Sequence, residues 1–371
     1  MASKINTYMK FPGIFLLILA LFLLLSPKLS ASDLEEQESL HSASLEPHPK
    51  KEEKVNITKV AFEHILDSHS WHFWGEGHDA VALPLPCIIY STNKGLQFFS
   101  SSVFEHGHAE FNGYKLVEEE IISNDLEEKV YDFSITKNVA QLLLSAVLLF
   151  LLFTSIARAY KTTGITNAPK GKQSFFEPLI TFVRDDIAKT NIGTKSDRFV
   201  PYLLTVFFLI LLNNVLGMIP IGANLTGNIA FTLVLSFITL IVTNVNGNKN
   251  YWHHIFAPPV PKGLYIMMIP LEIVGIFTKP FALMIRLFAN MTAGHIIVIS
   301  LVGLIFVFNS IWISIVSVPF TLFIDVLECL VALLQAYIFT LLTALFIGTA
   351  CADHNEDGVH NTDDDKAMEK H

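Results

Sequence analysis

Two apolar segments near the C-terminus restrict the possible folds more than any other feature of this chain. Residues 264–306 and 311–350 each exceed the roughly 20 residues with which an upright helix crosses a bilayer. Three shorter apolar stretches precede them, at residues 139–159, 201–218 and 229–245. The pattern predicts an all-α polytopic membrane protein with about five transmembrane helices. The last two should form a long C-terminal hairpin that is strongly tilted or broken, with Pro270 and Pro280 as places to bend.

Composition supports a membrane protein that carries one polar appendage. Hydrophobic residues make up 51% of the chain and the mean hydropathy is +0.47, too apolar for an ordinary soluble protein. The net charge of -9 arises mainly from residues 33–132 and from the tail, residues 353–371. No basic stripe is present, so nucleic-acid binding has no support. Cys87, Cys329 and Cys351 fall in three different regions, which argues against an internal disulfide framework.

The N-terminal third differs from the apolar remainder. Residues 1–31 predict a secretory signal peptide, because Lys4 and Lys10 precede an apolar core that is followed by a small-residue cleavage site; an uncleaved anchor is the alternative. Residues 32–135 then predict an extracytoplasmic domain whose Ser-, Glu-, Pro- and Lys-rich start is disordered. A small α+β domain is expected there, with a short helix at residues 60–66 and strands at residues 80–90, 96–104 and 109–117.

This domain is rich in histidine, namely His64, His69, His72, His78, His106 and His108. On a strand, His106 and His108 would share one face and could form a metal pair. No cysteine–histidine spacing supports zinc, so solvated surface histidines are the simpler interpretation and we predict no metal site. A proton-buffering role at a channel mouth is a further hypothesis.

Charge distribution predicts how the spans are oriented. Lys and Arg outnumber Asp and Glu in the connection at residues 158–198, which makes it cytoplasmic by the positive-inside rule. Within it, Ser174 and Glu177 have the spacing of a capping box before an amphipathic helix that lies along the membrane surface. The uncharged turn at residues 220–228 belongs outside, and the acidic tail at residues 353–371 ends in the cytoplasm. The transmembrane domain therefore covers residues 136–352.

An arginine lies within the first long apolar segment. A charged side chain at mid-membrane costs at least about 2.5–3.5 kcal/mol, so Arg286 should face protein or water and is a functional candidate. Its guanidinium cannot lose a proton at neutral pH. Glu272 precedes it by close to four helical turns and Asn290 follows it by one turn, on the same face. His295 points the other way, which suits two half-channels with the arginine between them.

The second long segment carries a polar stripe. Thr321, Glu328 and Gln335 recur every seven residues, and Asp325 lies one turn from Glu328. Carboxylates inside a membrane span usually have a functional role, so Asp325, Glu328 and His295 are candidates for a proton relay. A static His–Glu ion pair that only joins two helices is the alternative.

Three asparagines lie near the outer end of the preceding hairpin, at Asn213, Asn214 and Asn228. They could line a water-filled entry or bond one helix to another, and the sequence does not separate these two possibilities.

Two short motifs carry a family resemblance. The run Arg-Leu-Phe-Ala-Asn-Met from Arg286, the following Ala-Gly-His, and Leu-Gln-Ala-Tyr-Ile-Phe from Leu334 resemble the signatures of subunit a of F-type ATP synthases. The resemblance covers roughly residues 139–352. It implies that Arg286 faces the carboxylate of a rotating c-ring, that Gln335 approaches it, and that Asn290 stands beside the arginine. Glu272 matches an acid on the cytoplasmic exit path. His295 and Glu328 exchange the acid and imidazole positions of some relatives, which supports their being neighbours.

The resemblance implies a proton-translocating stator subunit in the inner (plasma) membrane of a bacterium. Its partners would be the c-ring, the peripheral stalk subunit b, other ATP synthase subunits and the lipid bilayer, with the N-terminal domain periplasmic and the C-terminus cytoplasmic. It would have no cofactor and would not be an enzyme itself, since the chain has no nucleotide-binding loop. Alternatives are a secondary ion transporter, which would need an inverted repeat, and a sodium-driven form of the same subunit.

Overall fold

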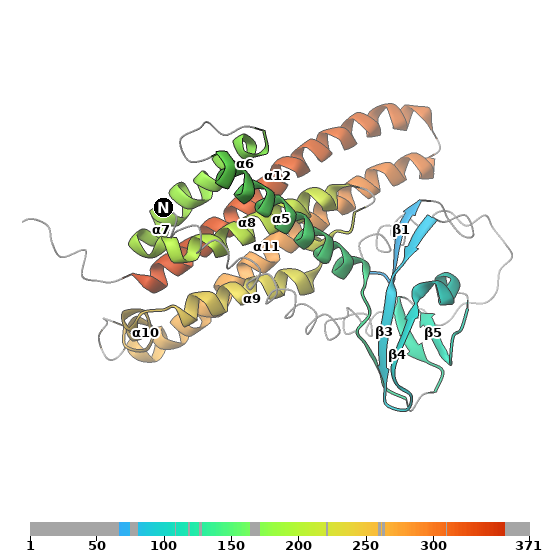
Figure 1. Ribbon diagram of the computed structural model, residues 1–371, viewed down its shortest axis with the longest axis horizontal. Coiled ribbons are helices and arrows are strands. Elements are labelled where there is room, and N and C mark those ends of the chain that lie inside the picture. The colour runs from blue at the N-terminus through green and yellow to red at the C-terminus, as the bar shows by residue number, and fades with distance from the viewer. Residues whose placement is uncertain are drawn as a thin grey trace, which may run out of the picture.

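The computed structural model describes residues 67–74, 81–107, 109–117, 119–125, 128–163, 171–219, 222–258, 261, 264–308 and 310–352. A helical bundle makes up most of the molecule, and a group of short strands lies beyond one end of it (Figure 1). The predicted signal peptide, the start of the N-terminal domain, the helix at residues 60–66 and the acidic tail fall outside the described residues.

The membrane helices agree with the apolar segments of the sequence. The long helices are α5 (Lys137–Thr163), α8 (Ser196–Met218), α9 (Ile229–Val245), α11 (Tyr265–Phe308) and α12 (Ile311–Cys351). In the described part of the chain, four helices are long and apolar enough to cross a membrane, and a fifth span results if α9 and α10 (Lys249–Phe256) count as one segment bent by 102°. The chain is therefore a polytopic helical membrane protein.

Helices α11 and α12 are continuous, so the expected break at Pro270 or Pro280 is wrong. Both prolines lie inside α11, and Pro319 lies inside α12, without ending either helix. Apolar packing between the two antiparallel helices holds both in place where a proline removes one backbone bond. With 44 residues, α11 is about 66 Å long, twice the thickness of a bilayer core. A helix of this length fits inside a bilayer core only when it is tilted.

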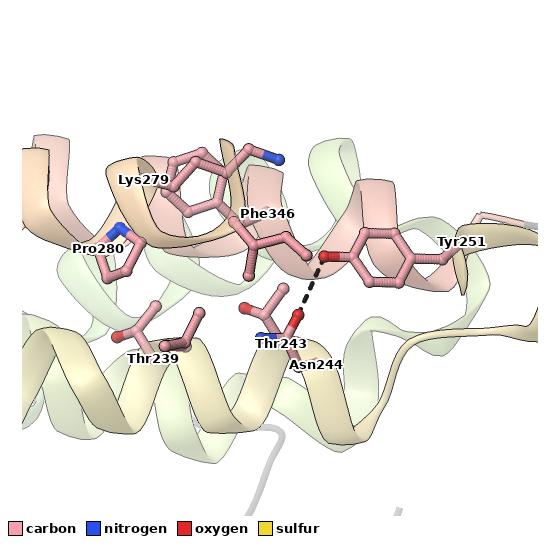
Figure 2. Close-up of a pocket in the computed structure, with 9 residues that line it drawn as sticks. Thr239, Thr243, Asn244, Tyr251, Lys279, Pro280 and Phe346 are labelled. Carbon is pink, nitrogen blue, oxygen red and sulfur yellow. Dashed lines mark hydrogen bonds between the residues drawn. The ribbon is translucent and has the colours of Figure 1, made fainter. Parts of the chain in front are cut away.

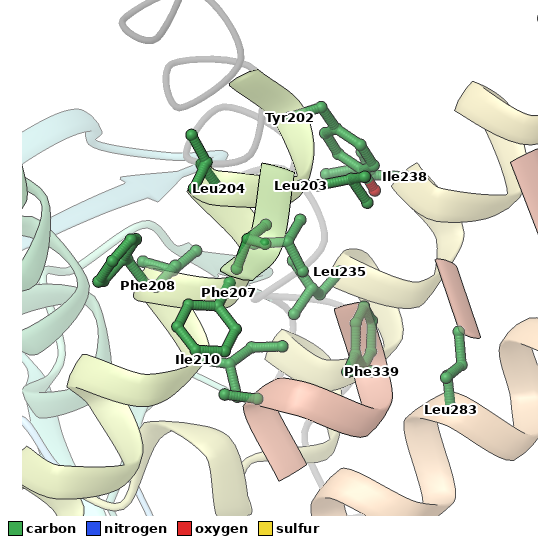
Figure 3. Packing of buried hydrophobic residues seen from close by; sticks show 14 of the residues in the cluster. Tyr202, Leu203, Leu204, Phe207, Phe208, Ile210, Leu235, Ile238, Leu283 and Phe339 are labelled. Carbon is green, nitrogen blue, oxygen red and sulfur yellow. The ribbon is translucent and has the colours of Figure 1, made fainter. Parts of the chain in front are cut away.

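Helix α8 lies at the centre of the bundle. It is apolar on all sides, as expected of a helix surrounded by others, and contacts α5 and α12. Figure 3 shows Phe207 and Phe208 of α8 in a cluster that also includes Leu235 of α9, Leu283 of α11 and Phe339 of α12. Burial of this continuous core fixes the positions of the two long helices.

The segment before α8 differs from its prediction. Helix α6 (Lys172–Thr181) begins after Gly171, whose φ of 64° stops it, so Ser174 is not the N-cap. It continues through a π-helix, η5 (Phe182–Lys189), a turn of α-helix, α7 (Thr190–Ile192), and a 3-10 turn, η6 (Gly193–Lys195). Its expected apolar side packs against protein instead of lipid: Val183 and Ile187 are fully buried against α8 and α12.

Short antiparallel strands precede α5. They form three sheets: β1 (Ser70–Trp74) with β2 (Val81–Pro84), the order β4 (Gly95–Ser100), β3 (Pro86–Ser91), β7 (Val130–Asp132), and β5 (Tyr114–Val117) with β6 (Glu120–Ser123). The predicted strand at residues 96–104 ends at Ser100 and continues as a 3-10 helix, η4 (Ser101–Gly107). The strand predicted at residues 109–117 begins only at Tyr114, because Asn112 and Gly113 adopt positive φ and turn the chain.

The strand region has a small core and a fixed junction with α5. Its core consists of side chains from three strands and η4, namely Cys87, Ile89, Phe104, Tyr114 and Ile121. At the junction, the Lys137 amide donates to Ser68 O at 2.9 Å, and Asp67 Oδ1 accepts from the Asn138 amide at 3.1 Å. Asp67 thus satisfies the first turn of α5, and the strand region cannot rotate freely about it.

Candidate functional site

Arg286 lies in the middle of α11 on its exposed side. Leu283, Leu287 and Met291 of the same helix are buried in the bundle, whereas Arg286 and Asn290 are exposed. Among the described residues, no hydrogen bond or ion pair engages Arg286. The result is a permanent cation on the exposed surface of an apolar helix, where it needs water or a charged partner.

Gln335 occupies a different environment from Arg286. It lies on α12 and is only 5% exposed, within the packed interior. Within the described part of the chain, no hydrogen bond links it to Arg286. The approach of Gln335 to the rotor site involves a partner outside this chain, and its role stays a prediction. Helical spacing alone places residues on a face, but only the neighbours of that helix decide whether the face is open.

His295 and Glu328 are neighbours across the α11–α12 contact. The distance between His295 Nδ1 and Glu328 Oε1 is 3.5 Å, and Glu328 is 7% exposed. Gly294 makes room for this carboxylate, because a Cβ there would lie 2.8 Å from Glu328 Oε1. The predicted proximity is confirmed, while the relay itself stays a prediction. Sequence reasoning missed Gly294, whose role shows only when both helices are in place.

The carboxylate of Glu328 has unfilled hydrogen-bonding capacity. Its Oε1 is buried and has no hydrogen-bond partner among the described residues, and the same holds for Thr321 Oγ1 one stripe position earlier. Asp325, one turn before Glu328, is half-buried. Buried polar atoms are normally satisfied by protein or ordered water. These atoms therefore mark a place where water or a proton carrier would be stabilised.

Two of the three asparagines bond helices together. Asn213 donates to Ser145 Oγ of α5 at 3.2 Å, and Asn214 donates to the Ala332 carbonyl of α12 at 3.0 Å. Asn228 instead caps α9 by accepting from the Ala230 amide at 2.8 Å. The amide oxygens of Asn213 and Asn214 are nevertheless buried without a partner in the described part of the protein. Asn214 joins α12 one turn beyond Glu328, so its free acceptor lies on the same stretch of that helix.

Glu272 lies on the other side of Arg286, towards the N-terminal end of α11. Its Oε1 is 3.9 Å from His254 Nδ1 of α10, a partner that the sequence did not reveal because a loop separates the two helices. Glu272 and His295 are about 34 Å apart along α11, with Arg286 between them. The structure therefore provides one His–Glu pair on each side of the arginine.

A small cavity with mainly apolar walls and a few polar groups lies between Glu272 and Arg286. It has a volume of about 10 Å³, enough for about one water molecule. Figure 2 shows the Tyr251 hydroxyl donating to Asn244 Oδ1 at 3.0 Å, with Thr239 and Thr243 beside it. Lys279 Nζ lies over the Phe346 ring at 5.5 Å. No local sequence pattern predicted this group, because its members come from four helices, α9, α10, α11 and α12.

No metal centre is found in the described part of the chain. No group of three or more His, Cys, Asp or Glu residues there could hold an ion. The expectation that His106 lies on a strand is wrong, because it lies in η4, and His108 is outside the described residues. The three cysteines are free.

Comparisons with known proteins agree with this geometry. The family model described as ATP synthase A chain matches residues 139–348, and one described as a domain of unknown function (DUF8433) matches residues 60–142. The chain is 48% identical to "ATP synthase subunit a" of Chloroherpeton thalassium over 234 residues, 61% of this chain and 70% of the relative. It is 48% identical to "ATP synthase subunit a 2" of Chlorobium luteolum over 321 residues, 85% of this chain and 81% of the relative. The chain belongs to the ATP synthase A chain family.

Proposed function

We propose that this chain moves protons between two half-channels and a rotor carboxylate that meets Arg286. As a member of its family it is the proton-translocating stator subunit of an F-type ATP synthase. The single observation that carries the half-channel proposal is the position of Arg286, exposed on the membrane side of α11 between two separate His–Glu pairs. Chemistry on ATP belongs to other subunits of the complex.

The first half-channel would run through Glu328, His295 and Asp325. The 3.5 Å separation of His295 Nδ1 and Glu328 Oε1 is slightly longer than a hydrogen bond, so a small side-chain movement would bring the two groups within reach for direct proton transfer. An imidazole and a carboxylate can each bind and release a proton, as a relay requires. Unpartnered oxygens on Glu328, Thr321 and Asn214 support a hydrated path to it.

The second half-channel would pass the cavity beside Lys279 and reach Glu272 and His254. The cavity accepts about one water and is lined by hydroxyl, amide and phenol groups that can hydrogen-bond to it. Glu272 and His254 are each partly exposed, as a proton exit to solvent requires. Among the described residues, no hydrogen bond or ion pair joins this path to the His295–Glu328 pair, and Arg286 would separate the two paths.

The energies involved suit reversible transfer. At an effective dielectric of about 20, Arg286 and a rotor carboxylate 4 Å away would attract by roughly 4 kcal/mol. A proton crossing 100 mV releases about 2.3 kcal/mol. The attraction is strong enough to keep a passing carboxylate ionised and comparable with the driving force, so it does not trap the rotor.

We further propose that residues 32–135 lie in the periplasm after removal of residues 1–31 as a signal peptide, and that the C-terminus is cytoplasmic. Described basic residues between α5 and α8, including Lys161, Lys172, Lys189 and Lys195, support a cytoplasmic connection there. Partners would be a c-ring facing Arg286 and Asn290, and a peripheral stalk subunit b. Gln335 would approach the rotor site after a rearrangement of α12.

The test is ATP-driven proton pumping by membrane vesicles that carry the assembled complex. Arg286→Ala should abolish pumping, and Arg286→Lys should also fail because lysine can lose its proton when desolvated and lacks the planar fork. Arg198→Ala removes the same charge at the start of α8 and is the matched control. Normal coupled pumping by Arg286→Ala, at normal assembly, would refute the proposal.

A sodium-driven form is the second candidate. It is tested by imposing either a pH gradient or a sodium gradient on the same vesicles and measuring ATP synthesis. The His295–Glu328 pair favours protons, because an imidazole carries protons but is a poor sodium ligand. Synthesis that follows only the sodium gradient would overturn the proton assignment and leave the role of Arg286 intact.

A further inference from the structure

The sheet β4–β3–β7 has one apolar face that no described residue covers. Its other face holds Cys87 and Ile89 in the small core. On the open face, Phe98, Ile88 and Phe133 form one cross-strand row, and Leu96, Tyr90 and Tyr131 form the next. Phe98 is 68% exposed and Tyr131 51% exposed. The result is a continuous patch of six large apolar side chains, here called the aromatic face.

The position of this face relative to the membrane follows from the junction with α5. With 27 residues, α5 is about 40 Å long, against a hydrocarbon thickness of about 30 Å. Its first residue, Lys137, is therefore within about 10 Å of the hydrocarbon edge. Phe133 precedes Lys137 by four residues, which extend at most about 14 Å. Together these limits place the start of the aromatic face within about 24 Å of the hydrocarbon edge, on the side of the membrane where α5 begins.

The strand region is held in one orientation at this depth. The Lys137 amide bonds to Ser68 O, the Ile135 amide bonds to Pro86 O at 3.1 Å, and Asp67 caps the first turn of α5. In Figure 1, η4 and β5 lie on the side of β3 and β4 away from the helices, so the open face is turned towards the membrane part. Exposed side chains of α5 such as Val147 and Leu151 continue the apolar surface into the bilayer.

We propose that the aromatic face is a membrane anchor, seated in the interfacial region of the leaflet next to the start of α5. Tyr and Phe suit this region, because their rings are apolar while the Tyr hydroxyl reaches water and headgroups. Contact with lipid removes the six side chains from water without any partner protein. The anchor would hold the strand region against the bilayer and fix the tilt of α5 at its first turn.

The test uses the assembled complex in native membranes, with a photoreactive benzoylphenylalanine placed at Phe98 or, as control, at Lys115. Lys115 is exposed on β5 and points away from the core on the other side of the strand region. After irradiation, position 98 should carry lipid adducts several-fold more often than position 115. Crosslinks from position 98 to a second copy or to another subunit, or equal lipid yields at both positions, would overturn the proposal.

A second variant guards against perturbation by the bulky probe. Phe98→Trp replaces one exposed aromatic side chain by another, and its added fluorescence is obtained by subtracting the emission of the parent. In vesicles of brominated phosphatidylcholine this added emission should be strongly quenched. Emission that brominated lipid leaves unchanged, at normal assembly, would place position 98 in water and contradict the anchor.

Discussion

Two glutamates of this protein have the same burial and opposite surroundings. Glu128, beside the strands, and Glu328, in α12, are each 7% exposed. Glu128 accepts hydrogen bonds from Ser91 Oγ, Tyr114 OH and Ser123 Oγ. Glu328 has His295 at 3.5 Å and a buried oxygen without a partner among the described residues. Equal burial therefore does not imply an equal role.

The difference lies in which protonation state the surroundings stabilise. The hydroxyl of Ser123, with those of Ser91 and Tyr114, holds the pKa of Glu128 below its ordinary value, so this carboxylate stays ionised and structural. Three donors favour the ionised carboxylate, because protonation would weaken their bonds. Glu328 has no such set of donors among the described residues. A buried carboxylate with few partners is the kind of group that can change protonation during turnover.

The largest expected effect comes from exchanging each glutamate for glutamine. Glu328→Gln should lower ATP-driven proton pumping roughly a hundredfold, because the amide cannot carry a proton. Glu128→Gln, the matched control at equal burial, should leave pumping per assembled complex unchanged while weakening the strand region. Pumping is measured with a pH-sensitive dye, and assembly by native gel electrophoresis. If the two variants pump alike, the contrast between the two sites is wrong.

A smaller effect is expected from crowding Glu328 without removing it. Gly294→Ala adds a Cβ 2.8 Å from Glu328 Oε1, which forces the carboxylate to shift. Because proton transfer depends steeply on geometry, pumping should fall several-fold while the complex still assembles. Gly275→Ala on the same helix is the control, since a Cβ there meets nothing within 4 Å. Equal rates for both variants would show that Glu328 tolerates displacement.

The His69–Asp132 pair of the strand region extends the comparison to pH. His69 Nε2 lies 2.7 Å from Asp132 Oδ2. Burial opposes the charged imidazole, but the hydrogen bonds with Asp132 and Glu119 outweigh it and raise the pKa of His69 to about 9 from 6.5. Since the folded-state pKa is the higher one, this contribution is complete below pH 6.5 and is lost as pH rises through 9. It amounts to about 3 kcal/mol.

Hydrogen exchange of the strand region, corrected for the intrinsic pH dependence of exchange, measures this change. Protection should decline between pH 6.5 and 9.5 in the parent protein. The decline should be absent in His69→Gln, which has no titrating imidazole at that position. A parent protein with constant protection across this window would contradict the role of the His69–Asp132 pair.

The smallest effect is expected where one of several donors is removed. Tyr114→Phe deletes the hydroxyl that lies 3.2 Å from Glu128 Oε1 but leaves two serine donors in place. The thermal unfolding midpoint of the strand region should fall by only a few degrees, and proton pumping should not change. Scanning calorimetry of the reconstituted protein provides the measurement. A large loss would mean that Glu128 depends on the tyrosine far more than its three-donor arrangement suggests.

The sequence predicted the membrane helices well because long apolar runs leave few alternatives in a bilayer. It also brought His295 and Glu328 together, through helical spacing and the family resemblance. It failed where short-range signals compete with tertiary packing. Residues 101–104 were predicted as part of a strand but belong to η4, whose Phe104 enters the small core. Pro280 suggested a bend, yet α11 continues past it without a break.

Contacts between separate helices were the other limit. Spacing along α12 placed Gln335 on one stripe with Glu328, but only the packing of α12 against its neighbours shows that Gln335 is buried. His254 reaches Glu272 from α10, and Gly294 makes room for Glu328, through contacts that no local pattern encodes. Such partners become visible only when the elements are assembled.

The uninterrupted length of α11 has a consequence for how depth is measured in this protein. A helix of about 66 Å inside a layer of about 30 Å advances only about 0.7 Å in depth per residue. Arg286 and His295 then differ in depth by about 6 Å, and most of their separation is sideways, in the plane of the membrane. Under the proposed mechanism, a proton that passes between the two ends of such a slanted helix has to move mainly in the plane of the membrane. A rotating carrier supplies this lateral movement, whereas a straight pore does not.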